Sequence, residues 1–481
     1  MRDQQRQNIV AVLPRGEAIR NFVYSGALDE AARGMCVTLL TVIPDDEYLE
    51  SVGKGRFDRV VELASHPDHR FLNLLREQLD ISHGRYLWSA AARDRWRLRD
   101  YEADTPVRWL KRATKKLLAY PFANSAGVEL LSKVEQTASR ILRSTEEELN
   151  LLRELDPSLV FNGSHAHSRN SIRLIHAAKQ LGIPTAAFIF SWDNLTSEGR
   201  IIPHYDYYLV WNEALRDQLL SIYPSARREQ IFVTGTPQFD FHFRPEFFQT
   251  REEFCLRTGA DPSRPIVLYT TGMDNHMPEE PRLVEGVYET LRRMTQFGPP
   301  QLMVRLYPKD RRPERFDDLR RRCPEILFPH IPWIAKWQTP KPEDSYLLTN
   351  MLRHSALGVN IASTVSLELA MFDKPIINVG YNPPGVDISP INFALYYDFD
   401  HYRPVVKSGA VSVAWTEGEM RDLLTEGLTE PHKDSHKRRA FVRTMFGDTL
   451  DGQSGSRVAQ TLYRLAHRAG HIETDPEMKP R

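Results

Sequence analysis

The sequence predicts an α/β protein with two Rossmann-like, doubly wound domains. The chain has 481 residues, which is more than one hydrophobic core usually holds. Short apolar, strand-like runs alternate with amphipathic helical patterns, and this alternation is typical of parallel sheets. The alternation occurs twice, in residues 1–240 and again in residues 265–433, and a charged, aromatic linker at 241–264 separates the two series.

The first series opens with NIVAVL at residues 8–13, which reads as a buried parallel strand ending before Pro14. An amphipathic helical pattern follows and ends at Gly34, and CVTLLTVIP then predicts a second strand, so the three form one βαβ unit. Four further strands are predicted in SLVFNG, TAAFIF, YDYYLVW and IFVTG, with helices after the first and the third of them.

A basic helical insertion at about 85–155 interrupts this first series. Its part from 85 to 120 is dense in Arg, Lys and Trp and is broken at Pro106. Three interpretations stay open: an interfacial helix on anionic lipid, a groove for an acidic polymer, or a solvated helix whose tryptophans pack on the domain. The tryptophans concerned are Trp88, Trp96 and Trp109.

The second series begins with PIVLYTTG and QLMVRLYP, two predicted strands. After a loop rich in Trp and Pro, the stretch from Ser345 to Tyr381 predicts helix, strand, helix and strand in close succession. Residues 434–468 predict C-terminal helices, and 469–481 form a polar tail.

Composition argues against several classes of function. Lys and Arg number 63, as do Asp and Glu, so no global charge draws the protein to nucleic acid, and no nucleic-acid recognition motif is present. The three cysteines lie far apart and fit a reducing compartment. Without a signal peptide or about 18 consecutive apolar residues, we expect a cytoplasmic protein, with peripheral contact at the inner face of a membrane left open.

The richest functional pattern follows the predicted strand that ends near Ala362. Ser363 and Thr364 are good N-cap residues for the next helix, whose N-terminal N–H groups suit a diphosphate. Glu368 lies one turn further on and could accept hydrogen bonds from the hydroxyls of a ribose. The alternative is a plain helix cap with Glu368 on the surface.

Other polar residues also follow strands of the second series. Thr270, Thr271 and Gly272 end one strand and are candidates for donor contacts. Arg305 and Lys309 follow another and could support a leaving diphosphate, although both also fit a solvated charged loop.

The run STVSLELA from Ser363 to Ala370, followed by KPIINVG, resembles the donor-site helix of GT-B enzymes related to UDP-N-acetylglucosamine 2-epimerase and CDP-glycerol glycerophosphotransferase. The resemblance implies that the turn holds phosphates and that Glu368 holds the ribose. Two departures are visible. Thr364 and Val365 stand where the epimerases tend to have glycines, and Tyr307 stands where related transferases usually carry His.

Four further segments are similar to the same superfamily and occur in the expected order: FSWDNLTSEGR, VTGTPQFD, VRLYPKD and FGDTLDGQSGSRVAQTL. The resemblance implies the GT-B architecture, in which two Rossmann-like domains face a central cleft and a C-terminal helix follows. It also implies a nucleotide-sugar donor, a glycan or lipid-linked acceptor, and catalysis that needs neither a metal nor another cofactor.

An inverting transferase must remove a proton from the acceptor hydroxyl, and GT-B enzymes commonly place the base after the first strand. That loop contains Arg15, Gly16 and Glu17 here, so Glu17 is a candidate base and its neighbours are candidate acceptor contacts. The competing explanation is the general preference for Glu in a first helical turn. Asp193 is the second candidate base.

Acceptor contacts are predicted after two other strands. Trp192 could stack on a sugar face and Asn194 could bond its hydroxyls, unless the pair forms a core residue and an Asx turn. His165 and His167 follow the strand SLVFNG, and without a third ligand nearby they favour substrate contact over a metal site.

The sequence thus predicts a glycosyltransferase that builds a bacterial cell-surface polysaccharide or glycoconjugate. Three alternatives stay open: a nucleotide-sugar epimerase or hydrolase, a glycerophosphotransferase of the same fold, and a non-catalytic scaffold that binds nucleotide or glycan. Nothing in the sequence identifies the nucleotide base, the sugar, the acceptor, the stereochemical course or the oligomeric state.

Overall fold

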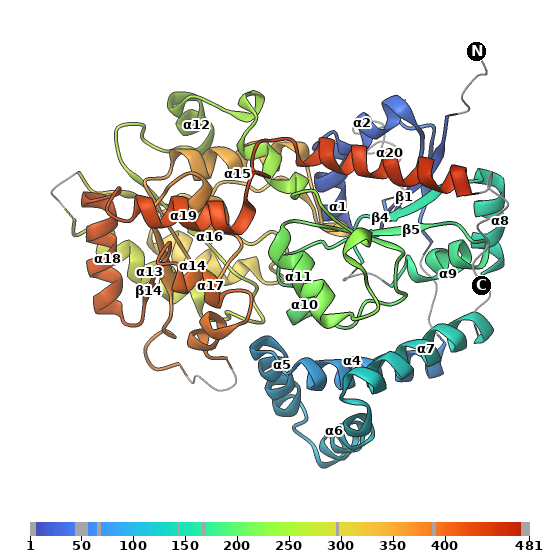
Figure 1. Ribbon diagram of the computed structural model, residues 1–481. Helices are drawn as coiled ribbons and strands as arrows, with labels where there is room; N and C mark the ends of the chain where they lie inside the picture. Colours follow the sequence, from blue (N-terminus) through green and yellow to red (C-terminus); the bar gives the residue numbers. More distant parts are fainter. Residues whose placement is uncertain are drawn as a thin grey trace. The chain divides into compact units, whose positions relative to one another are not determined.

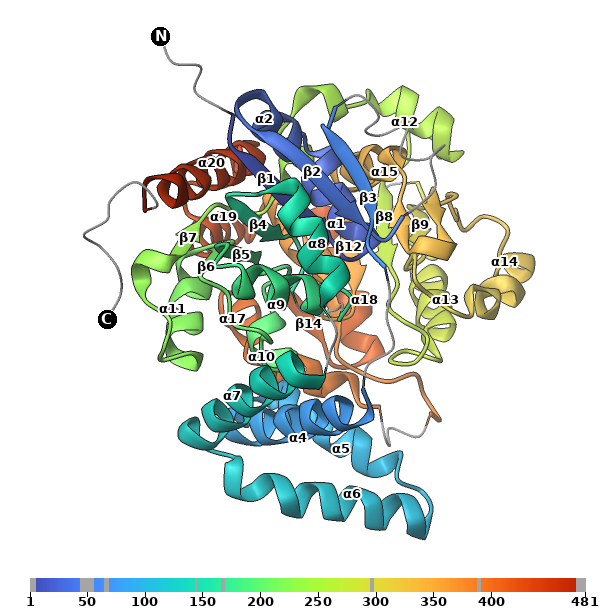
Figure 2. The same cartoon turned by 90° about the vertical axis from the view of Figure 1, so that its right-hand side faces the viewer.

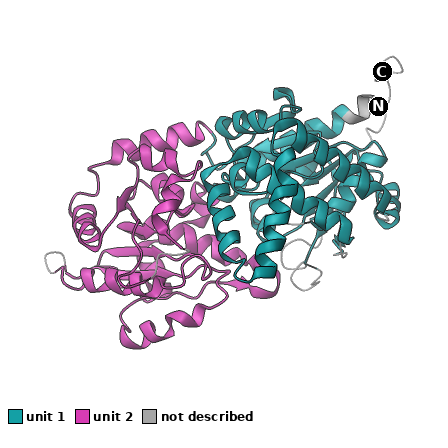
Figure 3. Cartoon of the chain, turned by 90° about the horizontal axis from the view of Figure 1, so that it is seen from below, with its two compact units in different colours: residues 1–240, 449–481 teal, residues 241–448 magenta. Residues whose placement is uncertain are grey.

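A computed structural model describes residues 6–43, 56–64, 69–142, 145–165, 169–294, 298–386 and 391–472. The chain divides into two compact units, coloured separately in Figure 3. Unit 1 comprises residues 1–240 and 449–481, and unit 2 comprises residues 241–448. Each is an α/β unit built around a parallel sheet, as the repeated alternation predicts.

Unit 1 is built on a seven-stranded sheet in the order β3-β2-β1-β4-β5-β6-β7. Every neighbouring pair is parallel, and the chain reverses its direction of winding between β1 and β4. In a doubly wound sheet, ligands bind outside the carboxyl ends of the strands at such a reversal. The strands are β1 (Asn8–Leu13), β2 (Cys36–Thr41), β3 (Arg59–Glu62), β4 (Leu159–Asn162), β5 (Thr185–Phe188), β6 (Tyr207–Val210) and β7 (Ile231–Val233).

The helical segment after β1 is not one continuous helix. It consists of α1 (Gly16–Ile19), a π-helical turn (Arg20–Tyr24) and α2 (Ala27–Gly34). Gly26 lies between them with φ of 81°, a left-handed conformation that only glycine adopts without strain. The remaining helices on this sheet are α9 (Ile172–Gln180), α10 (Asn194–Ser197) and α11 (Glu213–Ile222).

The insertion between β3 and β4 is entirely helical in its described parts. Its helices are α4 (Arg70–Leu87), α5 (Ala90–Tyr101), α6 (Pro106–Ala119), α7 (Ser125–Leu142) and α8 (Glu146–Leu155). Pro106 opens α6, where a missing N–H costs nothing, and Thr105 caps that helix. Figures 1 and 2 both show α6 as the outermost helix of the insertion, beyond α4.

One prediction about the tryptophans of this insertion is wrong. Trp88 and Trp96 are partly buried and their rings meet edge to face with centroids 5.4 Å apart. Trp109 instead lies on α6 with 63% of its surface exposed, because this helix buries only Ala119.

Unit 2 contains a five-stranded parallel sheet in the order β14-β13-β12-β8-β9. The reversal lies between β8 and β12, which pair in parallel. The strands are β8 (Ile266–Thr270), β9 (Gln301–Arg305), β12 (Leu357–Asn360), β13 (Ile376–Val379) and β14 (Ser412–Ala414). The helices include α12 (Arg251–Thr258), α13 (Glu280–Leu291), α14 (Asp317–Arg322), α15 (Pro342–His354), α16 (Val365–Met371), α17 (Arg403–Lys407), α18 (Glu417–Thr429) and α19 (Ser435–Phe446).

The segment expected as a linker, 241–264, lies within unit 2. Its helix α12 carries a capping box between Thr250 and Glu253. Arg251 on that helix donates hydrogen bonds to the carbonyl oxygens of Pro262, Arg264 and His354. The two C-terminal helices belong to different units, since α19 is part of unit 2 and α20 (Ser454–Ile472) is part of unit 1.

Two of the sequence motifs meet where α20 joins unit 1. Asp240, the last residue of VTGTPQFD, accepts hydrogen bonds from the first N–H groups of α20, at Ser454 (3.1 Å) and Gly455 (2.8 Å). Arg457 donates to the carbonyl oxygen of Thr234 (2.9 Å) and pairs with Asp451. Residues of the motif FGDTLDGQSGSRVAQTL therefore anchor the C-terminal helix beside the last strand of the first sheet.

We predict that Asp240→Ala destabilises unit 1. The substitution leaves two buried N–H groups without an acceptor, which costs about 2 kcal/mol and lowers the unfolding midpoint by about 4–8 °C. Thermal unfolding followed by circular dichroism measures the shift. Asp422→Ala, at an exposed position of α18, is the matched control, and an equal midpoint for both variants would contradict the anchoring role.

Candidate functional site

In unit 1, the candidate acceptor residues gather at the carboxyl edge of three neighbouring strands. Arg15 and Glu17 follow β1, His165 follows β4, and Asp193 follows β5. These strands are adjacent in the sheet, with β4 between the other two. The fold thus brings these predicted residues together at one edge of the sheet, although their side chains differ greatly in what they are able to do.

Glu17 is held by its neighbour. Arg15 donates two hydrogen bonds to its carboxylate, at 2.7 and 2.6 Å, and Glu17 is only 5% exposed. Both carboxylate oxygens of Glu17 therefore already accept a hydrogen bond from Arg15. Arg15 also lies over the ring of Phe190, 4.9 Å from its centroid, and Gly16 is buried in the same turn.

Asp193 and its neighbours mainly organise a turn. The Ser197 hydroxyl donates to Asp193 at 2.6 Å, and the side-chain oxygen of Asn194 accepts from the N–H of Ser191 at 2.9 Å. Trp192 is 5% exposed and Asn194 is 2% exposed. Trp192 thus has the burial of a core residue, which was the alternative to sugar contact, whereas the bond from the Ser191 N–H to Asn194 runs back along the chain and is not the expected Asx turn.

His165 is positioned by a hydrogen bond between its Nδ1 and the carbonyl oxygen of Phe188, at 3.1 Å. Burial lowers the pKa of this imidazole to about 4, so the ring is neutral at pH 7. A carbonyl only accepts, which means that Nδ1 carries the proton and Nε2 is an acceptor. His167 lies outside the described residues.

Sequence reasoning missed Glu198, a second carboxyl group at this edge whose pKa is raised. It is partly buried just after α10, and desolvation raises its pKa to about 7, with the nearby Asp193 and Asp80 adding to the effect and Arg95 and Arg15 opposing it. A carboxyl group with a pKa near the working pH is suited to proton transfer. Its position within FSWDNLTSEGR was the only available signal.

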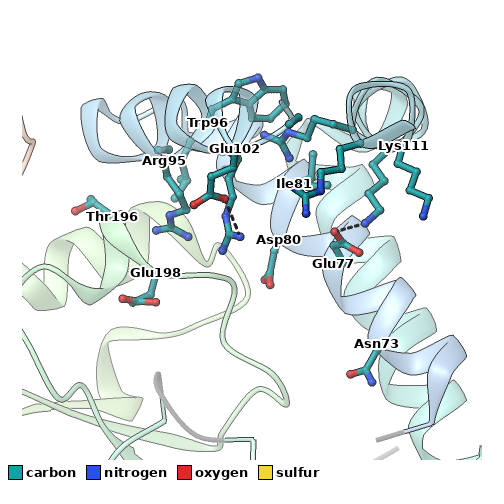
Figure 4. Close-up of a pocket in the computed structure, with 18 of the residues that line it drawn as sticks. Asn73, Glu77, Asp80, Ile81, Arg95, Trp96, Glu102, Lys111, Thr196 and Glu198 are labelled. Carbon is teal, nitrogen blue, oxygen red and sulfur yellow. Dashed lines mark hydrogen bonds and ion pairs between the residues drawn. The ribbon is translucent and has the colours of Figure 1, made fainter. Parts of the chain in front are cut away.

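Two cavities converge on Glu198. One has a volume of about 230 Å³ and includes His165, Asp80 and Arg95 in its lining. The other has a volume of about 650 Å³, extends under α5 and α6 of the insertion, and is shown in Figure 4. Both include Asp80, Arg95, Arg169 and Glu198. Burial also raises the pKa of Asp80 to about 6.

In unit 2, a row of polar side chains crosses the carboxyl edge of the sheet. Thr270 pairs in register with Arg305, and Asn360 pairs with Asn378. Thr270 and Asn360 each lie one residue beyond the paired Tyr269 and Val359. The four residues therefore occupy the same level of four adjacent strands, at the reversal where doubly wound sheets bind ligands.

Glu368 is buried, contrary to the expectation for a plain surface residue, and it is 7% exposed. His242 donates from Nε2 to Oε1 of Glu368 at 3.1 Å, and Nδ1 of the same ring contacts the Thr349 hydroxyl at 3.0 Å. The other carboxylate oxygen, Oε2, has no hydrogen-bond partner among the described residues. His242, which the sequence reasoning also missed, thus fixes the carboxylate and leaves one oxygen for a ligand.

A network of buried hydrogen bonds holds the turn before α16 in place. The Asn360 side-chain oxygen accepts from the N–H of Ser363, from the Ser366 hydroxyl and from the Asn378 amide. The Tyr402 hydroxyl donates its proton to the Asn378 side-chain oxygen at 2.8 Å, and its oxygen lies 2.9 Å from the Ser366 hydroxyl. Ala362 in this turn has φ of 41°, a strained value for a residue with a Cβ.

The capping prediction for α16 is correct for only one of its two residues. The Ser363 hydroxyl accepts from the N–H of Val365 at 3.2 Å, whereas the Thr364 side chain makes no capping bond. The next two N–H groups bond to carbonyl oxygens of the same turn. Most first-turn donors of this seven-residue helix therefore already have acceptors, so its N-terminus offers less to a diphosphate than predicted.

Three other residues predicted to contact the donor already form hydrogen bonds or ion pairs within unit 2. The Thr271 hydroxyl accepts from the N–H of Tyr307 at 2.8 Å, and the N–H of Gly272 donates to Glu280, whose pKa burial raises to about 7. Arg305 pairs with the buried Asp344 at 2.8 Å. Lys309 is partly exposed on the loop after β9.

Some polar atoms at this edge have no partner in the described part of the unit. They are the Thr270 hydroxyl, the Asn360 amide nitrogen, one terminal nitrogen of Arg305, and the Ser345 hydroxyl on α15. Buried polar groups are nearly always hydrogen-bonded in folded proteins, so such atoms call for a ligand or bound water. Three of them belong to the polar row that crosses the sheet.

No family model and no curated protein matches the chain. Solved structures do match. A UDP-N-acetylglucosamine 2-epimerase aligns with a TM-score of 0.53 and 11% identity, over 99% of this chain and 98% of its own. A UDP-N-acetylglucosamine 2-epimerase from Rickettsia bellii aligns with a TM-score of 0.53 and 11% identity, over 99% of this chain and 100% of its own. The UDP-GlcNAc 2-epimerase from Neisseria meningitidis, bound to UDP-GlcNAc, aligns with a TM-score of 0.53 and 10% identity, over 95% of this chain and 100% of its own.

Likeness at this level of identity establishes the fold. The chain has the GT-B fold over nearly its whole length, and the fold predicted from the sequence resemblance is confirmed. None of the described helices combines the length and the apolar character that crossing a bilayer requires.

Proposed function

We propose that this protein is a glycosyltransferase that uses a nucleotide-activated sugar. Unit 2 binds the nucleotide at the carboxyl edge of its sheet, and unit 1 binds the acceptor in the cavities around Glu198. Two observations support the proposal, one at the carboxyl edge of the sheet in each unit. One edge fixes Glu368 with an oxygen left free, and the other opens into cavities that contain a carboxyl group with a pKa near 7.

Recognition of the nucleotide rests on Glu368. Its Oε2 accepts hydrogen bonds from the ribose hydroxyls, while His242 holds Oε1 and keeps the carboxylate in place. The partnerless atoms of Thr270, Asn360 and Arg305 supply further polar contacts along the same edge. The names of the solved structures that share this fold support a nucleotide sugar as ligand, because all three are epimerases of UDP-N-acetylglucosamine.

Transfer requires a base for the acceptor hydroxyl. In the proposed reaction the hydroxyl oxygen bonds to the anomeric carbon, the bond from that carbon to the nucleoside diphosphate breaks, and the diphosphate leaves with the electron pair. Glu198 takes the hydroxyl proton. His165 is a poorer base because burial lowers its pKa to about 4, but its Nε2 is able to accept a hydrogen bond from the acceptor.

The second candidate is a nucleotide-sugar epimerase, which the names of the similar structures favour. An epimerase acts on a single sugar and needs no acceptor. The cavity of about 650 Å³ in the insertion of unit 1 is an additional site of ligand size, which favours a reaction with two substrates.

The insertion also suggests where a lipid-linked acceptor would be met. Helix α6 exposes Val107, Leu110, Leu117 and Leu118, each at 57–72%, and their spacing puts them on one face of the helix. Its exposed basic residues are Arg108 and Lys111, whereas Arg112, Lys115 and Lys116 are partly buried and pair with Asp100 or Glu77. A helix with an apolar face and basic flanks fits an anionic membrane surface, and we propose that α6 lies on one.

The donor assignment predicts a nucleotide-specific rise in melting temperature. We expect one of UDP, GDP, CDP, ADP, dTDP or CMP to stabilise the protein, and Glu368→Gln to weaken its affinity about tenfold through the loss of charge-assisted hydrogen bonds. Glu426→Gln, at a surface ion pair of α18, is the control and should bind like the native protein. If Glu368→Gln bound the nucleotide with unchanged affinity, the donor site would lie elsewhere.

The assignment of Glu198 predicts a pH dependence. Transfer needs the carboxylate, so kcat/KM should fall about tenfold per pH unit below pH 7 and level off above it. Glu198→Gln should lower kcat at least a hundredfold and abolish this limb of the profile. Glu17→Gln is the comparison. A profile that keeps its acid limb in Glu198→Gln, or conversion of the donor sugar without any acceptor, would count against the proposal.

Membrane contact predicts co-sedimentation with vesicles that contain phosphatidylglycerol and not with vesicles of phosphatidylcholine alone. Leu110→Glu/Leu117→Glu places charges on the apolar face of α6 and should abolish sedimentation. The control Leu256→Glu alters a residue of α12 that is 89% exposed and should sediment normally. Binding that survives the double substitution would exclude α6 as the contact.

A further inference from the structure

The larger cavity of unit 1 is an open pocket between the insertion and the loop that carries Glu198. Its walls come from α4, α5 and α6, together with Arg169, Thr196 and Glu198 from the segments around the sheet edge. The volume of about 650 Å³ lies within the range of sites that bind organic ligands. Figure 4 shows charged side chains from all three helices directed into it.

The lining is strongly cationic although the chain as a whole has no net charge. Seven arginine and lysine side chains line the cavity, against four aspartates and glutamates. Two of these acids are engaged locally, since Glu102 pairs with Arg99 and Glu77 pairs with Lys115. A concave surface that collects one sign of charge concentrates ligands of the opposite sign.

Two of the cations form no direct bond to another described side chain, although Arg95 is close enough to Glu198 and Asp80 to oppose the rise in the pKa of both carboxyl groups. Within the part of the chain that the structure describes, Arg95 on α5 and Lys111 on α6 make no hydrogen bond and no ion pair. Their basic neighbours on the same helices do, because Arg97 pairs with Asp94 and Arg112 pairs with Asp100. Figure 4 shows Arg95 near Glu198 and Lys111 at the opposite side of the cavity. A ligand that reaches both cations must therefore be extended.

The inner end of the cavity leads to the candidate base. Asp80, Arg95, Arg169 and Glu198 line both this cavity and the smaller one beside His165, so the two spaces adjoin. A ligand held by its anionic groups along α5 and α6 would extend a neutral hydroxyl toward Glu198.

We propose that this cavity binds an extended acceptor with more than one anionic group, such as a segment of an anionic polysaccharide, through Arg95 and Lys111. The acceptor role rests on the proposed transferase function, whereas the binding site itself does not. The anionic groups are carboxylates or phosphates, since both accept charge-assisted hydrogen bonds from arginine and lysine.

Isothermal titration tests the site with three soluble probes: a galacturonic acid trisaccharide, inorganic tripolyphosphate, and neutral maltotriose. We expect at least one anionic probe to bind the native protein and maltotriose to bind at least tenfold more weakly. Arg95→Gln/Lys111→Gln should weaken the anionic probe at least tenfold, because each charge-assisted hydrogen bond contributes about that factor. The anionic probe that binds identifies carboxylate or phosphate as the group recognised.

The matched control is Arg93→Gln/Lys133→Gln, which removes the same two charges from exposed positions of α5 and α7 outside the cavity. This variant should bind within twofold of the native protein. Equal weakening in both double variants, equal binding of maltotriose, or no binding of either anionic probe would overturn the proposal. Nucleotide binding, measured on the same variants, reports on unit 2 and separates this failure from a failure of the proposed function.

Discussion

The hydrogen bond between His242 and Glu368 is the constraint on which the functional interpretation of this protein depends. Glu368 is a buried carboxylate on a short helix, and a buried charge needs a partner. His242 satisfies one oxygen, and Thr349 holds the other side of the imidazole ring. The remaining carboxylate oxygen, Oε2, is therefore held in a fixed orientation. A carboxylate fixed in this way lies at the reversal point of a doubly wound sheet, where such sheets bind ligands, and this is the basis of the proposed nucleotide site.

Internal hydrogen bonds also explain why several groups that follow strands are poor candidates for contact with a ligand. Arg15 holds Glu17, and Glu280 holds the N–H of Gly272. Each of these groups follows a strand and was attractive from its position alone. Their internal hydrogen bonds stabilise the loops that carry the candidate ligand-binding groups. The groups that stay available, such as Oε2 of Glu368, are those whose local partners satisfy them only in part.

Sequence periodicity predicted the fold well because both sheets are parallel and their strands are continuous apolar runs. NIVAVL became β1 and the strand near Val359 became β12, with strand ends close to those expected. The break at Gly26 and the return of α20 to unit 1 were not visible, because they depend on a left-handed backbone and on contacts across more than 200 residues. The candidate site was less predictable. Glu198 has a raised pKa only because the fold buries it beside Asp193 and Asp80, which no local pattern encodes.

Hydrogen–deuterium exchange with and without UDP-N-acetylglucosamine tests the central claim most directly, because it reports where a nucleotide sugar binds rather than whether it binds. The account predicts slower exchange in peptides that contain residues 270–275 and 361–368, at the carboxyl edge of the sheet in unit 2, and loss of that protection in Glu368→Gln. Protection confined to other parts of unit 2, or protection that persists unchanged in Glu368→Gln, would contradict it.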